Sequence, residues 1–169
     1  ASGQEPVGKG GADHLGFFAA ITIETTGVIL ELNGKTLQQT KLHSLQQRFF
    51  ANIETASAPF IPKQGPSTNG FSSASNYKPG EKVLIKNGIL SRSSHHGIHG
   101  NKNTNIIIQN LSIKDFEVAG IALNGTTIGI LDNIKINTTS LDMRILSTYS
   151  QARFARPFLK TIKSRNPTA

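Results

Sequence analysis

The chain has 169 residues, a formal net charge of +8 and no cysteine, with 37% hydrophobic and 17% charged residues. Disordered chains combine low hydrophobicity with high charge, so this composition predicts one folded domain. The lack of cysteine excludes disulfide frameworks, cysteine nucleophiles and cysteine zinc sites. The longest apolar run, Phe17 to Ile21, is too short to span a bilayer, and we expect no transmembrane segment.

Residues 1–18 are predicted to form an N-terminal lead-in. This segment is glycine-rich and has neither a starting Met nor an apolar signal core, so we expect the chain to be a fragment or a processed product. Residues 19–42 follow a β pattern. Ile21–Glu24 alternates, and the run from Val28 to Leu37 has the order strand, Asn-Gly turn, strand. This segment is predicted to form the first coil of a β structure.

Residues 43–80 are predicted as a long excursion from this pattern, because four of the seven prolines gather there. The run from Ser44 to Gln47 has the spacing of a capping box and predicts a short helix that leads into Phe49 and Phe50. Long loops of repeat proteins often build a binding face. A flap that only covers the core explains the excursion equally well.

Residues 81–142 contain an internal repeat of about 23 residues. Within each repeat, apolar residues alternate over short stretches and turn residues interrupt them, which is typical of short strands that stack in parallel from one coil to the next. Asparagine tolerates left-handed backbone, and its amide can both donate and accept, so one column predicts a hydrogen-bonded ladder. Four columns share the period: Asn87, Asn110 and Asn133; Ile85, Ile108 and Leu131; Leu90, Ile113 and Ile136; Gly97-Ile98 and Gly120-Ile121.

Two segments of the chain resemble a known family. VILELNGKTL (28–37) is similar to an early coil, and NIIIQNLSIKDF (105–116) to later coils, of the pectin-lyase-like superfamily. β-Helix proteins of unassigned role from large viruses and protists have this architecture too. The resemblance implies an all-β, right-handed parallel β-helix. It also implies activity on acidic polysaccharides, by carboxylate-catalysed hydrolysis or by elimination with an Arg or Lys base, often with calcium.

Residues 143–169 are predicted to form a basic helical tail. Its four helically spaced cations are Arg153, Arg156, Lys160 and Lys163, and the segment contains six basic and no acidic residues. The tail therefore carries +6 of the net +8. Such a face can bind an acidic protein surface or another anionic partner. A solvated helix face whose apolar side packs on its own core remains the alternative.

The acidic residues do not favour hydrolysis. Asp115 and Glu117 could share one face of a strand, but the repeat places no carboxylate next to them in the preceding or following coil. Inverting hydrolysis needs two carboxylates at a fixed separation, and calcium needs a cage of oxygen ligands. Neither arrangement is evident, and we expect no cofactor and no metal.

Elimination needs a cation and a base, which Arg, Lys and His can supply. The candidate catalytic residues are His95, His99 and Arg92, and Lys102 joins them as a candidate for binding substrate. A regular strand over 95–99 places His95 and His99 on one face and His96 on the other with Ile98. It separates His95 and His99 by roughly 13 Å, too far to share a metal ion. A polar turn region that binds nothing is the alternative.

Two functions follow from these patterns. The first is a non-catalytic structural or assembly module of a virion or cell surface, in which the tail docks on other subunits. The second is an acidic-polysaccharide-binding protein or a polysaccharide lyase acting by β-elimination. An open end of stacked strands needs a partner or a cap, which favours the first. Either function predicts a secreted, cell-surface or virion location.

Overall fold

The strands form two parallel sheets. The computed structural model describes residues 18–46, 50–57, 77–137, 160 and 163–164. The prediction of an all-β chain with parallel strands is confirmed for these residues. Their elements are β1 (Phe18–Thr22), β2 (Ile29–Glu31), β3 (Thr36–Leu37), α1 (Lys41–Gln46), β4 (Phe50–Glu54), β5 (Glu81–Leu90), β6 (His96–Asn101), β7 (Thr104–Lys114), β8 (Ala119–Asn124) and β9 (Gly129–Asn137).

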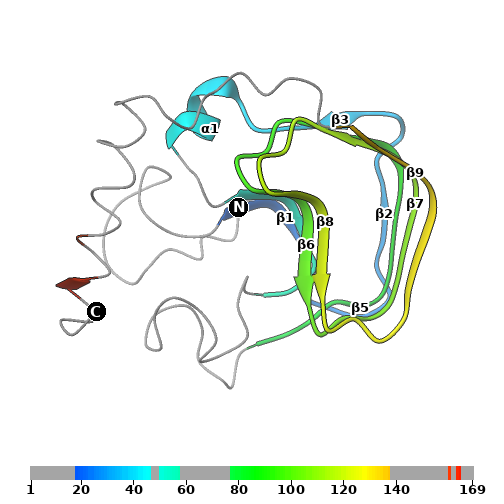
Figure 1. Ribbon diagram of the computed structural model, residues 1–169. Helices are drawn as coiled ribbons and strands as arrows, with labels where there is room; N and C mark the ends of the chain where they lie inside the picture. Colours follow the sequence, from blue (N-terminus) through cyan, green and yellow to red (C-terminus); the bar gives the residue numbers. More distant parts are fainter. Residues whose placement is uncertain (1–17, 47–49, 58–76, 138–159, 161–162, 165–169) are drawn as a thin grey trace.

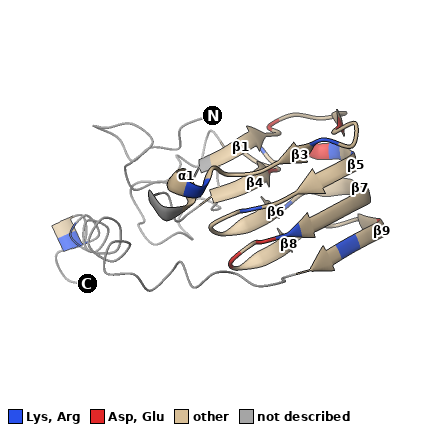
Figure 2. Ribbon diagram, turned by 90° about the horizontal axis from the view of Figure 1, so that it is seen from above, with Lys and Arg blue, Asp and Glu red and all other residues tan. Residues whose placement is uncertain are grey.

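From β4 onward, successive strands alternate between the two sheets. One sheet has the order β1-β4-β6-β8, and the other has the order β2-β5-β7-β9, with β3 also paired to β5. In Figure 1 the chain winds along nested paths, and β6 and β8 lie opposite β5, β7 and β9. Figure 2 shows the strands of each sheet in succession, with β8 and β9 in the last layer. Inward side chains from both sheets form one apolar core that includes Ile53, Ile85, Ile98 and Ile108.

The strand register confirms the 23-residue repeat. Ile85 pairs with Ile108, and Ile108 pairs with Leu131. The other sheet has the same offset, because Ile98 pairs with Ile121. Residues in one sequence column are therefore neighbours on adjacent strands. Aliphatic side chains at inward positions then stack on each other and exclude water from the space between the sheets.

The predicted asparagine ladder is also present. Asn133 Nδ2 donates to Asn110 Oδ1 over 2.8 Å, and Asn110 Nδ2 donates to Asn87 Oδ1 over 3.0 Å. All three residues have left-handed backbone, with φ between 49° and 58°. Asn87 Nδ2 donates in turn to Glu31 Oε2, a carboxylate that also lies 3.4 Å from Lys86 Nζ. The ladder thus ends at a carboxylate on the β2 side of the sheet.

The prediction of one excursion over 43–80 is wrong for residues 50–54. These residues form β4, which pairs with β1 and β6, and Ile53 is fully buried in the core. The repeat is hidden there because Ile53 pairs with Ile98, 45 residues later, instead of 23. The extra residues of this interval include 58–76, which lie outside the described residues.

The predicted helix is present but begins earlier. Thr40 Oγ1 accepts a hydrogen bond from the backbone N–H of His43, so Thr40 caps α1. Ser44 lies inside the helix, where its hydroxyl donates to the Lys41 carbonyl. Phe50 belongs to β4 and not to a helix. Of the predicted tail, the structure describes Lys160 and Lys163, both helical and exposed, while Arg153 and Arg156 lie outside the described residues.

Candidate functional site

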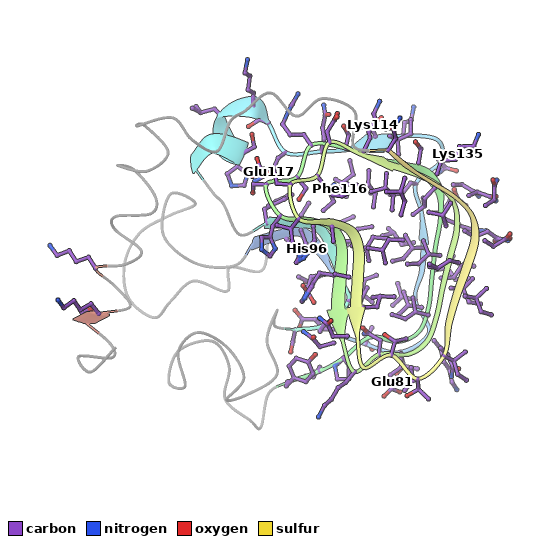
Figure 3. The ribbon with its side chains drawn as sticks, viewed as in Figure 1. Glu81, His96, Lys114, Phe116, Glu117 and Lys135 are labelled. Atoms are coloured by element: carbon purple, nitrogen blue, oxygen red, sulfur yellow. The ribbon has the colours of Figure 1, made fainter. Side chains whose placement is uncertain are left out.

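Three histidines and one glutamate gather where β6 lies beside β4. His99 Nδ1 lies 2.6 Å from Glu54 Oε2, and these two residues pair in the strand register. The His96 ring stacks on the His99 ring with centroids 4.8 Å apart, and the His95 ring contacts His96 edge-on at 4.0 Å. We call these four residues the histidine cluster. Figure 3 shows His96 on the side of β6 that points away from the core.

The arrangement of the histidines corrects the sequence prediction. His95 and His99 do not lie on one face opposite His96, because the His96 ring contacts both of the other rings. The alternation of a regular strand breaks between Gly97 and Ile98, because a Cβ at Gly97 would meet Ile113 Cγ2 in the core and Ile98 is itself buried there, so that His96 and His99 share the outer side. Ile98 is fully buried in the core, apart from the cluster. Gly97 lies between His96 and Ile98 and lets β6 approach β8 closely, since a Cβ at this position would lie 2.5 Å from the Gly120 carbonyl oxygen.

Burial shifts the pKa values of two members of the histidine cluster, His96 and Glu54. Burial lowers the pKa of His96 to about 3, with smaller contributions from His95 and His99. Burial also raises the pKa of Glu54, and the hydrogen bond and charge of His99 oppose this effect. His95 Nδ1 and His96 Nδ1 lie 2.8 Å apart, so one ring must donate a proton and the other accept it. A neutral His96 satisfies this contact.

Tyr77 extends the polar contacts of this face. Its hydroxyl donates to the Asn101 carbonyl over 2.8 Å, and its pKa is raised by burial and by the charge of Glu54. One oxygen of Glu54, Oε1, is buried without a hydrogen-bond partner, as is Oδ1 of Asn52 on the same strand. Since Glu54 and His99 are both almost fully buried, their pairing positions β4 against β6 and offers no open surface to a substrate.

The two cationic candidates, Arg92 and Lys102, lie before and after β6 and have different surroundings. Arg92 is half-buried, and its Nη1 donates to the Gln39 carbonyl over 3.1 Å, which ties it to the segment that precedes α1. Gln39 Oε1 also accepts from the Ser94 N–H. Lys102 is exposed, has left-handed backbone with φ of 55°, and follows the opposite end of β6. Arg92 therefore has a structural contact, and Lys102 is a solvated turn residue.

Several polar positions escaped the sequence analysis. Asn103 is fully buried; its Nδ2 donates to the Thr55 and Gly80 carbonyls, and its Oδ1 accepts from the Thr55 hydroxyl. A second asparagine pair, Asn124 and Asn101, repeats the ladder contact over 3.0 Å. The 23-residue spacing of Asn101 and Asn124 was a usable signal. Asn103 had none, because its partners lie in other parts of the chain.

Within the part of the chain that the structure describes, no strand covers the last layer. Ile85 and Ile108 are fully buried, but Leu131, the next residue of the same column, is 57% exposed. Leu90 and Ile113 are also buried, whereas Ile136, the next member of their column, is 50% exposed. The inward residues of β9 thus form an apolar surface at the end of the core, and we call it the β9 end.

Other site types find no support among the described residues. No group of three or more His, Cys, Asp or Glu side chains in these ranges could hold a metal ion. In the same part of the chain, no helix has both the length and the apolar character needed to cross a bilayer. Comparisons with protein-family models, curated proteins and solved structures found no match. The site must therefore be interpreted from its own geometry.

Proposed function

We propose that the chain is a non-catalytic structural module, a right-handed parallel β-helix of about 23 residues per coil that assembles with other subunits through its β9 end. The alternation of strands between two sheets and the constant register support this architecture. Modules of this kind suit a virion or a cell-surface layer. The ladder from Asn133 to Glu31 supports a rigid stack, because the side-chain amides of Asn110 and Asn87 each accept one hydrogen bond and donate another.

The exposure of β9 carries this proposal. Its core-facing residues continue columns that are buried in β5 and β7, yet Leu131 and Ile136 are about half exposed. Exposed apolar patches of this kind mark interaction surfaces. Among the described residues β9 is also the last strand in its sheet, and there its outer edge presents backbone groups that a further strand can pair. A partner strand would cover the apolar surface and would also form hydrogen bonds with the backbone groups along the edge of β9.

The alternative, binding or β-elimination of an acidic polysaccharide, has weaker support. A catalytic base must reach the substrate proton, and His99 and His96 are buried. The low pKa of His96 also keeps it a poor proton acceptor near neutral pH. The exposed side chains of Lys160 and Lys163 leave these two cations of the basic tail accessible to an acidic protein surface.

Sedimentation of the full chain over a range of concentrations tests the proposed assembly. We expect the mass to rise with concentration, and Leu131→Arg to suppress that rise. Leu42→Arg is the matched control, because Leu42 is 59% exposed on α1 and lies outside the β9 end. Equal effects of the two substitutions, or a mass that stays at one chain throughout, would contradict the assembly function.

A second assay separates assembly from catalysis. The protein is incubated with alginate, pectate and other polyuronates while the absorbance of the unsaturated product is followed. We expect no product. Product formation would contradict the non-catalytic function, and its loss in a His95→Ala variant, which keeps the buried His99–Glu54 pair, would assign the lyase activity to the histidine cluster.

A further inference from the structure

We propose that the β9 end binds a second copy of the chain, with β9 paired antiparallel to β9 of the partner subunit about a two-fold axis. This inference rests on the proposed assembly function and specifies its partner. Apolar exposure is concentrated at this end of the molecule. Of the seven large hydrophobic residues that are exposed in the described ranges, five lie in the last layer: Val118, Ile128, Ile130, Leu131 and Ile136.

The two ends of the stack differ in how well they can accept a strand. β9 has nine residues, Gly129–Asn137, and nearly all of them are exposed. At the other end, β2 has only three residues, and the ladder there is closed by the Glu31 carboxylate. A head-to-tail contact would have to join these unequal ends and would grow into an open filament. A contact between two β9 strands joins equal lengths and closes as a dimer.

The sequence of β9 is self-complementary in one antiparallel register. Asp132 then faces Lys135 of the partner subunit, and the two-fold axis repeats this pair. Both side chains are exposed, and both occupy positions that face outward from the core. Asp132 extends the column of Gln109, whose side chain donates to it over 2.8 Å, and Figure 3 shows Lys135 on the outer side of β9. Opposite charges that face each other across strands stabilise the pairing.

The same register matches the apolar residues. It places Leu131 opposite Ile136 of the partner subunit, and both residues belong to inward columns of their own chain. The bend of β9 at Asn133, where φ is 49°, lies next to Ile134 of the partner subunit, so that the two bends meet close to the axis. Away from the axis, where exposed Asn133 meets Ile134, this register therefore pairs inward with inward residues, outward with outward residues, and acid with base.

Cysteine cross-linking tests the register, and the chain has no cysteine of its own to interfere. In the variant that carries both Asp132→Cys and Lys135→Cys, each new thiol faces a thiol of the other copy. We expect this variant to form a covalent dimer on mild oxidation. Each single variant should stay monomeric on a denaturing gel, because its own symmetry mate lies about three residues, or roughly 10 Å, along the strand.

Charge reversal gives an independent readout of the same contact. Asp132→Lys places two lysines opposite each other twice in the dimer, and we expect the dissociation constant to rise by roughly tenfold or more. Lys135→Asp should act similarly, and the double variant Asp132→Lys, Lys135→Asp should recover the wild-type value. Loss of the Gln109 contact alone would not be repaired by the second substitution.

The outcomes distinguish this inference from the function on which it rests. Concentration-dependent assembly without cross-linking or charge rescue would overturn the β9–β9 register and leave the assembly function standing. A single-chain mass at every concentration would overturn both. Cross-linking of the double cysteine variant together with charge rescue is the result that the inference requires.

Discussion

His99 Nδ1 lies 2.6 Å from Glu54 Oε2, and the two side chains are only 8% and 2% exposed. Their strands, β6 and β4, are neighbours in one sheet, but the residues are 45 positions apart in the chain. This contact therefore joins two strands that are far apart in the sequence. Removal of the contact between His99 and Glu54 should therefore lower the free energy of unfolding.

Glu54→Ala should lower the free energy of unfolding by about 3 kcal/mol, because it leaves a buried imidazole without its carboxylate partner. Chemical denaturation followed by far-ultraviolet circular dichroism measures this change. Glu24→Ala is the control, since Glu24 is only half-buried and lies outside the histidine cluster. A cost for Glu54→Ala no larger than that of Glu24→Ala would refute a stabilising role for the pair.

The ladder can be tested within one strand. Asn110 and Asn105 are both exposed residues of β7, and their φ angles are 53° and 54°. Alanine at either position should lower the free energy of unfolding by about 1–2 kcal/mol, because alanine disfavours the left-handed backbone conformation. Asn110→Ala also removes the contacts with Asn87 and Asn133 and should cost about 1 kcal/mol more than Asn105→Ala. Equal denaturation midpoints for the two variants would mean that the ladder adds no stability.

Gly97→Ala should destabilise the fold by about 2 kcal/mol or more, because the new methyl group has no space. It would lie 2.5 Å from the Gly120 carbonyl oxygen and 2.8 Å from Ile113 Cγ2. Gly129→Ala is the matched control, since the nearest atom to its Cβ is Thr126 Cγ2 at 3.6 Å. Thermal unfolding at low protein concentration should show a clear drop in Tm for the first variant and little change for the second.

The low pKa of His96 predicts a loss of stability in mild acid. The folded state holds His96 neutral down to a pKa of about 3, whereas the unfolded chain takes up a proton near 6.5. As the pH falls between these values, protonation favours the unfolded chain, with a slope of at most about 1.4 kcal/mol per pH unit. The raised pKa of Glu54 acts in the opposite direction, because its extra stability is lost as the pH rises.

His96→Gln isolates the histidine contribution from that of Glu54. This variant should be less stable than the wild type at neutral pH, but the difference should shrink as the pH falls from 6.5 toward about 4. An unchanged slope in His96→Gln would show that another group is responsible for the acid sensitivity.

The constant repeat made the second half of the fold predictable from sequence. A spacing of 23 residues aligns Ile85 with Ile108 and Leu131, and the same spacing predicts the asparagine ladder without knowledge of the strand boundaries. Aliphatic and asparagine columns can be recognised in the sequence because a residue of each type lies next to a residue of the same type on the neighbouring strand. β4 was missed for the converse reason: its offset to β6 is 45 residues, so no column connects Ile53 with Ile98 at the repeat spacing.

The candidate site was less predictable than the fold. Simple strand alternation failed at His96, because Gly97 and Ile98 both face the core and a one-residue shift reverses the face of a side chain. The partner of His99 could not be identified from sequence, since nothing near Glu54 signals a histidine. Helix α1 was recognised from polar residues at the right place, but the cap is Thr40 and not Ser44.

Because the register is uniform from β5 to β9, the stack can be lengthened by whole repeats of 23 residues. A tandem copy of residues 104–126 would contribute one strand to each sheet and keep every existing column in line. Each added unit would thicken the stack by about 4.8 Å, the distance between neighbouring strands. The number of repeats therefore acts as a molecular ruler, which sets how far apart the two ends of the stack are held.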